Sequence, residues 1–173
     1  NGWIDREKLL SIEGRSRKPQ MELVEKYGIK EYPSPGGGCL LTEENFTRRL
    51  ITIRDDECWE YNELFILVRN SRFMRLSKGK YLFVGRHEMD NQALKEYENS
   101  GLLFVERDNV PGPLIVGFGD FSDEDKMFAA QLFSRYCRHK GKIPITVKMN
   151  KTIFNVPEIN FDEIEARIKE CII

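Results

Sequence analysis

Residues 72–85 read RFMRLSKGKYLFVG, and this stretch decides the fold. Two apolar runs, at positions 73–76 and 81–84, flank a polar turn that contains Gly79. This pattern predicts a β-hairpin, because glycine suits a tight turn and bulky apolar side chains suit the strands. The preceding residues 63–69, ELFILVR, form another apolar run, which is expected to pair with residues 72–76 in a hairpin through Asn70-Ser71. We therefore expect three antiparallel strands between positions 63 and 85.

The remainder of the second part alternates between helical and strand patterns. Gly101 and a Pro-Gly turn at 110–113 separate the expected elements, and Ser122 with Asp125 resembles a capping box that opens a helix. These elements are helices at 88–100, from 122 and from 160, and strands at 102–107, 114–118, 143–149 and 152–156. Residues 58–173 are therefore predicted to form a compact α+β domain, with packed helices on a mixed or antiparallel sheet.

Residues 1–57 are expected to form a short helical segment. Ser16 and Thr42 are the expected caps of two helices, the first burying Met21, Leu23, Val24 and Tyr27 and ending at Gly28. An acidic run at 55–57 marks the expected boundary with the second domain.

The loop between these helices, YPSPGGGCLLT at 32–42, presents Cys39 next to the expected N-terminus of the second helix. Backbone amides at such a terminus favour a thiolate, which is the reactive form of cysteine. Cys39 is therefore a candidate nucleophile. The alternative is that Cys39 is a buried residue at the start of the next element.

Composition excludes several classes of protein. The chain has 173 residues, 40% of them hydrophobic, and a net charge of −1, which is typical of a folded globular protein. No apolar run reaches the roughly 18 residues that a membrane span needs, so we expect a cytoplasmic protein. The four cysteines show no CxxC spacing and there are two histidines, so no metal site is expected. No phosphate-binding loop is present, so this chain is expected to bind no cofactor and to be inactive by itself.

Basic residues gather in two stretches, at 69–87 and 127–157, and neither stretch contains an acidic residue. Acidic residues lie elsewhere, so a protein of nearly zero net charge can present a basic face to a polyanion. The alternative is that these cations are ordinary solvated charges. The candidate RNA-binding residues are Arg69, Arg72, Arg86, Asn91, Arg135, Arg138, Lys140 and Lys142.

Two families resemble this chain. Residues 14–29, together with the cysteine loop and Asn45-Phe46, resemble the segment after the ATPase domain in PP-loop tRNA thiouridylase-like proteins, often labelled tRNA (5-methylaminomethyl-2-thiouridylate)-methyltransferases. The resemblance implies that Cys39 carries sulfur as a persulfide. It also implies that an ATPase domain absent from this chain uses ATP to adenylate a tRNA uridine, and that a sulfur donor protein is a further partner.

Residues 59–151 are similar to the RNA-binding module called NFACT-R. The matching motifs are FVGR at 83–86, NQAL at 91–94, VPGP at 110–113, FAA at 128–130 and Ser134-Arg135. This similarity implies an RNA-binding domain in which Arg86 and Asn91 form a polar pair near the RNA.

Together these patterns predict the C-terminal, tRNA-binding portion of a tRNA-modifying transferase. Two alternatives stay open. One is a protein-interaction or structural module that binds no RNA, and the other is a complete small enzyme with Cys39 as its nucleophile.

Overall fold

The structure, a computed structural model, describes residues 12, 17–31, 39–137, 144–157 and 159–173. The chain divides into two compact units, residues 1–39 and residues 40–173. The smaller unit contains helix α1 (Lys18–Lys26), which is followed by Gly28 with φ of 62°. None of the residues of α1 is buried, so the expected apolar core of this helix is wrong. The expected cap Ser16 lies outside the described residues.

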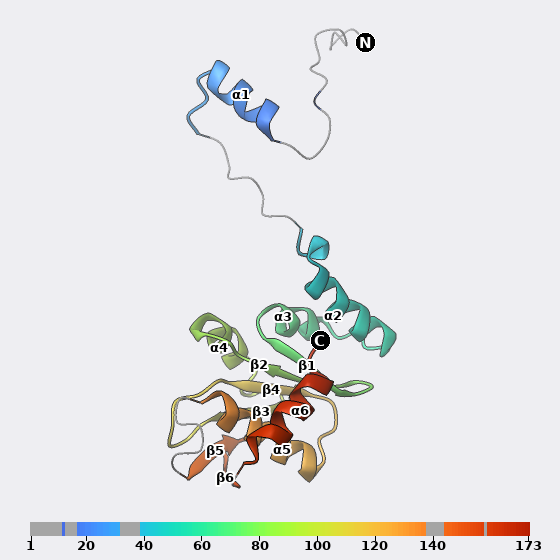
Figure 1. Cartoon of the computed structure of the whole chain (residues 1–173), viewed down its shortest axis with the longest axis vertical. Helices are drawn as coiled ribbons and strands as arrows, with labels where there is room; N and C mark the ends of the chain where they lie inside the picture. The colour runs from blue at the N-terminus through green and yellow to red at the C-terminus, as the bar shows by residue number, and fades with distance from the viewer. Residues whose placement is uncertain (1–11, 13–16, 32–38, 138–143, 158) are drawn as a thin grey trace. The chain divides into compact units, whose positions relative to one another are not determined.

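The larger unit is built on a six-stranded antiparallel sheet in the order β1-β2-β4-β3-β5-β6 (Figure 1). The hairpin of strands β1 and β2 is confirmed, with Arg72 opposite Val84 and Gly79 at φ of 69° in the turn. The α+β fold expected from the sequence is therefore correct, and its sheet is antiparallel. The strands are β1 (Arg72–Ser77), β2 (Lys80–Val84), β3 (Leu103–Arg107), β4 (Ile115–Phe118), β5 (Ile145–Met149) and β6 (Thr152–Val156).

Alternate residues of the central strands enter two separate cores, so the sheet is covered on both faces. Leu82 and Val84 pack with helices α5 (Asp123–Tyr136) and α6 (Phe161–Cys171). Tyr81 and Phe83 pack with residues of three other helices, on the opposite face. These helices are α2 (Glu44–Asp55), α3 (Asn62–Arg69) and α4 (Glu88–Lys95). The period of two along a strand produces this division.

The strand expected at 63–69 is wrong, because these residues form helix α3. Leu64, Leu67 and Val68 are buried, which is the i, i+3, i+4 spacing of one helix face. All five residues from 64 to 68 are apolar, so the sequence shows no period that could separate a helix from a strand. The sheet consequently begins at β1.

Helix ends follow the expected caps only in part. Ser122 and Asp125 form the expected capping box of α5, and the Asn160 side chain caps α6. Thr42 does not cap α2: it belongs to the 3₁₀ turn η2 (Leu40–Thr42), and Glu43 occupies the cap position without a side-chain hydrogen bond. The helix expected at 88–100 ends at Lys95 and continues as turns.

Asp56 lies in the acidic run that the sequence placed at a domain boundary, but its side chain is buried. Its carboxylate accepts hydrogen bonds from Arg75 Nε and Nη2 (both 2.8 Å), Tyr81 Oη (2.7 Å) and Gly79 N (3.2 Å). The bonds from Arg75 outweigh the effect of burial and lower the pKa of Asp56 to about 2. Asp56 thereby ties the end of α2 to the β1–β2 hairpin, and α2 belongs to the larger unit.

The outer edge of β1 is covered by the residues that follow α6. Met74 forms a β-bridge with Ile172, and Ile173 N donates to Phe73 O at 3.2 Å. Arg49 Nε of α2 donates to Ile173 O at 3.1 Å, and its Nη1 donates to Val68 O at 3.3 Å. These residues join α2, α3 and the chain end along one strand edge.

Candidate functional site

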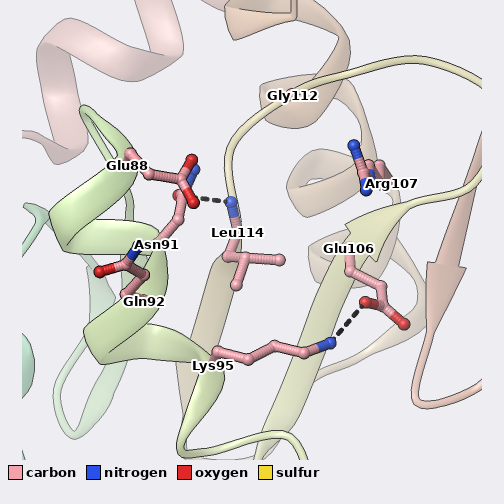
Figure 2. A pocket seen from close by; sticks show the side chains of 8 residues that line it. All are labelled: Glu88, Asn91, Gln92, Lys95, Glu106, Arg107, Gly112 and Leu114. Atoms are coloured by element: carbon pink, nitrogen blue, oxygen red, sulfur yellow. Dashed lines mark hydrogen bonds and ion pairs between the residues drawn. The ribbon is translucent and has the colours of Figure 1, made fainter.

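A groove lies at the end of the sheet where β1 and β4 begin and β2 and β3 end. Two adjoining hollows of about 460 Å³ and about 320 Å³ form this groove, and both are lined by Glu88, Asn91, Arg107 and Gly112. Figure 2 shows the smaller hollow between α4 and β3. We call the whole the α4 groove; it is lined by Arg72, Gly85, Arg86, His87, Glu88, Asn91, Gln92, Lys95, Glu106, Arg107, Pro111, Gly112, Pro113, Leu114 and Tyr136.

Asn91 sets the shape of the α4 groove by joining its two walls. The Asn91 Oδ1 atom accepts a hydrogen bond of 3.0 Å from Leu114 N, just before β4. A Cβ atom at Gly85 would overlap this same Oδ1 atom, so the close approach of α4 to the end of β2 requires glycine. Asn91 therefore positions the α4 wall against the loop that precedes β4.

Arg86 is held by a buried carboxylate. Arg86 Nε donates to Asp90 Oδ2 at 2.7 Å, and Arg86 N donates to the same oxygen at 3.0 Å. Burial would raise the pKa of Asp90, but the hydrogen bonds and charge of Arg86 outweigh it, and the pKa lies below its usual value. The Nη2 atom of Arg86 also donates to Arg69 O at 3.4 Å, at the end of α3. Arg86 therefore stabilises the groove wall as well as contributing charge to it.

Two other arginines bring positive charge to the α4 groove without a carboxylate partner among the described residues. The Arg72 guanidinium carbon lies 4.6 Å from the centre of the Tyr136 ring, and its Nη1 makes a long hydrogen bond of 3.5 Å to Gly85 O. Arg107 is exposed at the end of β3. A guanidinium without a protein carboxylate can form bidentate hydrogen bonds to a phosphate. Arg72 and Arg107 are therefore the best-placed groups for an anionic ligand.

The far end of the α4 groove is electrically balanced. Lys95 reaches from α4 across to β3, where its Nζ atom lies 2.9 Å from Glu106 Oε2 (Figure 2). Lys95 also lies 3.1 Å from Glu98 Oε2. These hydrogen bonds raise the pKa of Lys95, with Glu106 the largest influence. The positive charge of the groove is consequently concentrated around Arg72 and Arg107, where Glu88 is a carboxylate that lines both hollows.

The structure brings three predicted residues, Arg72, Arg86 and Asn91, to the α4 groove and places others elsewhere. The Arg69 side chain is exposed on α3. Arg135 pairs with Glu165 of α6, with Nε 2.7 Å from Oε1, and its guanidinium carbon lies 5.6 Å from the centre of the Tyr136 ring. The predicted residues Arg138, Lys140 and Lys142 lie outside the described residues.

Ion pairs reduce the basic character of the stretch at 69–87. Three of its cations lie in ion pairs away from the α4 groove, so sequence clustering overstates the charge available to a ligand. These pairs are Arg75–Asp56, Lys78–Glu57 and Lys80–Asp125.

Arg107 is a groove residue that the sequence did not single out as a site. It is separated from Arg72 by 35 positions, and only the strand order brings the two together. The signal that could have found Arg107 is its position at the end of an expected strand, separated by two residues from the Pro-Gly turn at 110–113.

Cys39 is exposed and lies immediately before the η2 turn. Cys58 and Cys137 are buried, and burial raises the pKa of Cys171. Among the described residues, no three His, Cys, Asp or Glu side chains gather as metal ligands would. None of the helices in the described ranges is long and apolar enough to cross a membrane.

Comparison with known proteins identifies the domain that carries the α4 groove. The family described as "NFACT protein RNA binding domain" matches residues 71–167, more than half of the chain. A solved structure of the C-terminal part of a fibronectin/fibrinogen-binding protein from Streptococcus suis is similar, with 20% sequence identity and a TM-score of 0.46. The match covers 60% of this chain and 49% of that one, so this chain spans about half the length of the solved relative. No curated protein matches the chain significantly. The chain belongs to the NFACT protein RNA-binding domain family.

Proposed function

We propose that the α4 groove binds the backbone of an RNA, and that this RNA is tRNA. The observation that carries the proposal is that Arg72 and Arg107 converge on one groove with no carboxylate partner among the described residues, in a domain of an RNA-binding family. Arginine suits phosphate because its planar guanidinium matches two phosphate oxygens. Arg86 and Asn91 support the walls of this groove through their hydrogen bonds with Asp90 and Leu114.

We further propose that this domain positions tRNA for a PP-loop ATPase domain in a larger, cytoplasmic, thiouridylase-like enzyme. The resemblance of residues 14–46 to such proteins supports this proposal, as does the exposure of Cys39. In that enzyme ATP activates a uridine by adenylation, and the outer sulfur of a persulfide on Cys39, supplied by a donor protein, displaces AMP. A partner cysteine of the ATPase domain then cleaves the S–S bond by forming a disulfide with Cys39, which leaves the sulfur on the tRNA. This chain supplies RNA binding and the thiol, and the other domain supplies the activation.

Salt-dependent binding tests the first proposal. The chain is titrated with unmodified tRNA and with a DNA duplex of equal charge at several salt concentrations. The double variant Arg72→Ala/Arg107→Ala is expected to bind tRNA at least about tenfold more weakly at low salt. Its slope of log K against log salt should be less steep by about two, one for each lost phosphate contact.

Arg54→Ala is the matched control, because Arg54 is an exposed arginine of α2 that pairs with Asp55 and does not line the α4 groove. This variant is expected to bind like the unchanged protein. An equal loss of tRNA affinity in both variants would show that the RNA is bound by positive charge spread over the surface rather than by the groove. A folded protein that binds no RNA even at low salt would instead favour the alternative function, a protein-interaction module.

Cys39→Ser in the full-length enzyme tests the second proposal. This variant is expected to keep its affinity for tRNA and to lose formation of thiolated tRNA, because serine cannot carry a persulfide. Full thiolation by Cys39→Ser would refute the role of Cys39 and leave the RNA-binding proposal intact.

A further inference from the structure

An exposed apolar surface lies around the start of α3, on residues that the α4 groove does not use. Trp59 and Ile66 each expose 50% of their surface, and Tyr61 exposes 40%. The Trp59 ring packs edge-on against Phe65, with 4.9 Å between the ring centres, and the Tyr61 ring contacts Phe118 at the same distance. We call these residues, Trp59, Tyr61, Phe65 and Ile66, the Trp59 face.

The rings of the Trp59 face are therefore held by neighbours and yet remain half open to solvent. Large exposed aromatic and aliphatic side chains that lie together mark interaction surfaces, and tryptophan and tyrosine dominate the binding energy of many interfaces. A fixed ring loses little conformational freedom when a partner covers it. These properties suit a docking surface.

Acidic residues outnumber basic ones in the stretch that contains the Trp59 face. Residues 54–69 contain five Asp and Glu residues and two arginines, Arg54 and Arg69, one at each end. Three of the five have basic partners: Arg54 pairs with Asp55, Arg75 with Asp56 and Lys78 with Glu57. Within the described ranges, Glu60 and Glu63 form no ion pair.

The acidic rim continues onto the end of α4. Burial, followed by the nearby charges of Glu63 and Glu96, raises the pKa of Tyr97. Glu63 of α3 and Glu96 therefore both lie close to Tyr97. Several carboxylates at this rim would repel RNA phosphates, whereas they would attract lysine and arginine.

We propose that the Trp59 face docks a basic amphipathic helix of a protein partner. The apolar side of this helix covers Trp59, Phe65 and Ile66, and its lysine or arginine residues lie against Glu60 and Glu63. Helix α3 has eight residues and so is about 12 Å long, which matches about two turns of a partner helix. The partner therefore presents apolar residues at positions i, i+3, i+4 and i+7. One domain thus carries a basic groove for RNA and an acidic, apolar face for protein.

A designed peptide of leucine and lysine provides a direct probe of the Trp59 face. The peptide is about 14 residues long with leucine at i, i+3, i+4 and i+7, and a second peptide has the same composition in scrambled order. Binding to the full chain is measured by calorimetry, and the contacted residues are located from backbone amide shifts in NMR spectra. The ordered peptide is expected to bind, and to shift the amides of residues 57–69.

Two variants separate the apolar and the electrostatic parts of the proposal. Ile66→Ser removes an exposed apolar side chain, and Glu60→Gln/Glu63→Gln removes two charges. Each variant is expected to bind the ordered peptide at least about tenfold more weakly than the unchanged protein does. Ile153→Ser is the control, because Ile153 is 62% exposed on β6 and does not belong to the Trp59 face. This control should bind the peptide like the unchanged protein.

Three results would overturn the proposal. They are equal binding of the scrambled peptide, peptide shifts confined to the α4 groove, and unchanged affinity in both variants. An oligouridine that shifts the amides of the Trp59 face, when the peptide does not, would assign this surface to RNA instead. None of these results depends on the groove arginines, so failure here leaves the RNA-binding proposal standing.

Discussion

Asp56→Asn tests the tie between α2 and the first hairpin. All the hydrogen-bonding partners of the Asp56 carboxylate described above are donors: two guanidinium nitrogens, a phenol and a backbone amide. Asparagine keeps the shape but carries one oxygen and one NH₂ group. The NH₂ group must face at least one of these donors, so the variant loses the negative charge and at least one hydrogen bond.

The low pKa of Asp56 gives the magnitude of the effect. A pKa that falls from 3.8 in the unfolded chain to about 2 in the folded protein is a difference of 1.8. At about 1.36 kcal/mol for each factor of ten, this corresponds to ~2.4 kcal/mol of folding free energy at neutral pH. A hydrogen bond to a charged group contributes about 1.5–3 kcal/mol, which is consistent with this value. We expect Asp56→Asn to lower the free energy of unfolding by about 2–3 kcal/mol.

The sign of the pH dependence follows from the direction of the shift. Because the folded pKa is lowered, the stabilisation is fully present above about pH 5 and is lost as the pH falls towards 2. Urea unfolding measured between pH 7 and pH 2 should therefore show that the stability gap between the original protein and Asp56→Asn narrows in acid. Other carboxylates affect both proteins equally and cancel in this difference.

Asp55→Asn is the matched control for this experiment. The Asp55 side chain is 60% exposed and pairs with Arg54 at the surface, so its loss should cost less than about 0.5 kcal/mol. If Asp56→Asn destabilised the protein no more than Asp55→Asn, or if its stability gap did not narrow in acid, the reasoning would be refuted.

Three further substitutions test the walls of the α4 groove. Gly85→Ala should cost about 1–3 kcal/mol, because its Cβ atom overlaps Asn91 Oδ1; a thermal melt measures this loss. Asn91→Ala should cost about 1–2 kcal/mol in urea unfolding and weaken RNA binding, since the loop before β4 loses its acceptor; an Asn91→Ala protein as stable as the exposed control Asn99→Ala would contradict this. Arg86→Ala should lower the free energy of unfolding by about 3 kcal/mol at neutral pH, because it leaves the buried Asp90 carboxylate without its main partner. Without Arg86, burial raises the pKa of Asp90, so this loss should shrink as the pH falls and Asp90 is protonated. A variant with unchanged urea stability would rule this out.

Local signals in the sequence predict much of the fold correctly. The β1–β2 hairpin follows from two apolar runs and a glycine, and the start of α5 follows from Ser122 and Asp125. In each case the deciding interactions join residues no more than 12 positions apart. Helix α3 was wrongly expected to be a strand because a run of five apolar residues has no period, and only its packing against the sheet selects the helix.

Contacts that are distant in the sequence account for what could not be predicted. An acidic run is typical of a solvated boundary, and nothing near Asp56 in the sequence indicates that Arg75 and Tyr81 will surround it. The α4 groove behaves similarly: Arg72, Arg86 and Asn91 were expected to bind RNA, but Arg107 joins them only because β3 ends at the same edge of the sheet as β2. The role of each in binding stays a prediction.

The covering of β1 by the last residues affects how this domain can meet another copy of itself. A bare strand edge offers a row of amide and carbonyl groups to any extended chain, and it is a common starting point for aggregation. Ile172 and Ile173 already occupy part of that row on β1, and Arg49 holds them there. An extended chain that approaches this sheet from the β1 side therefore finds part of the strand edge already occupied.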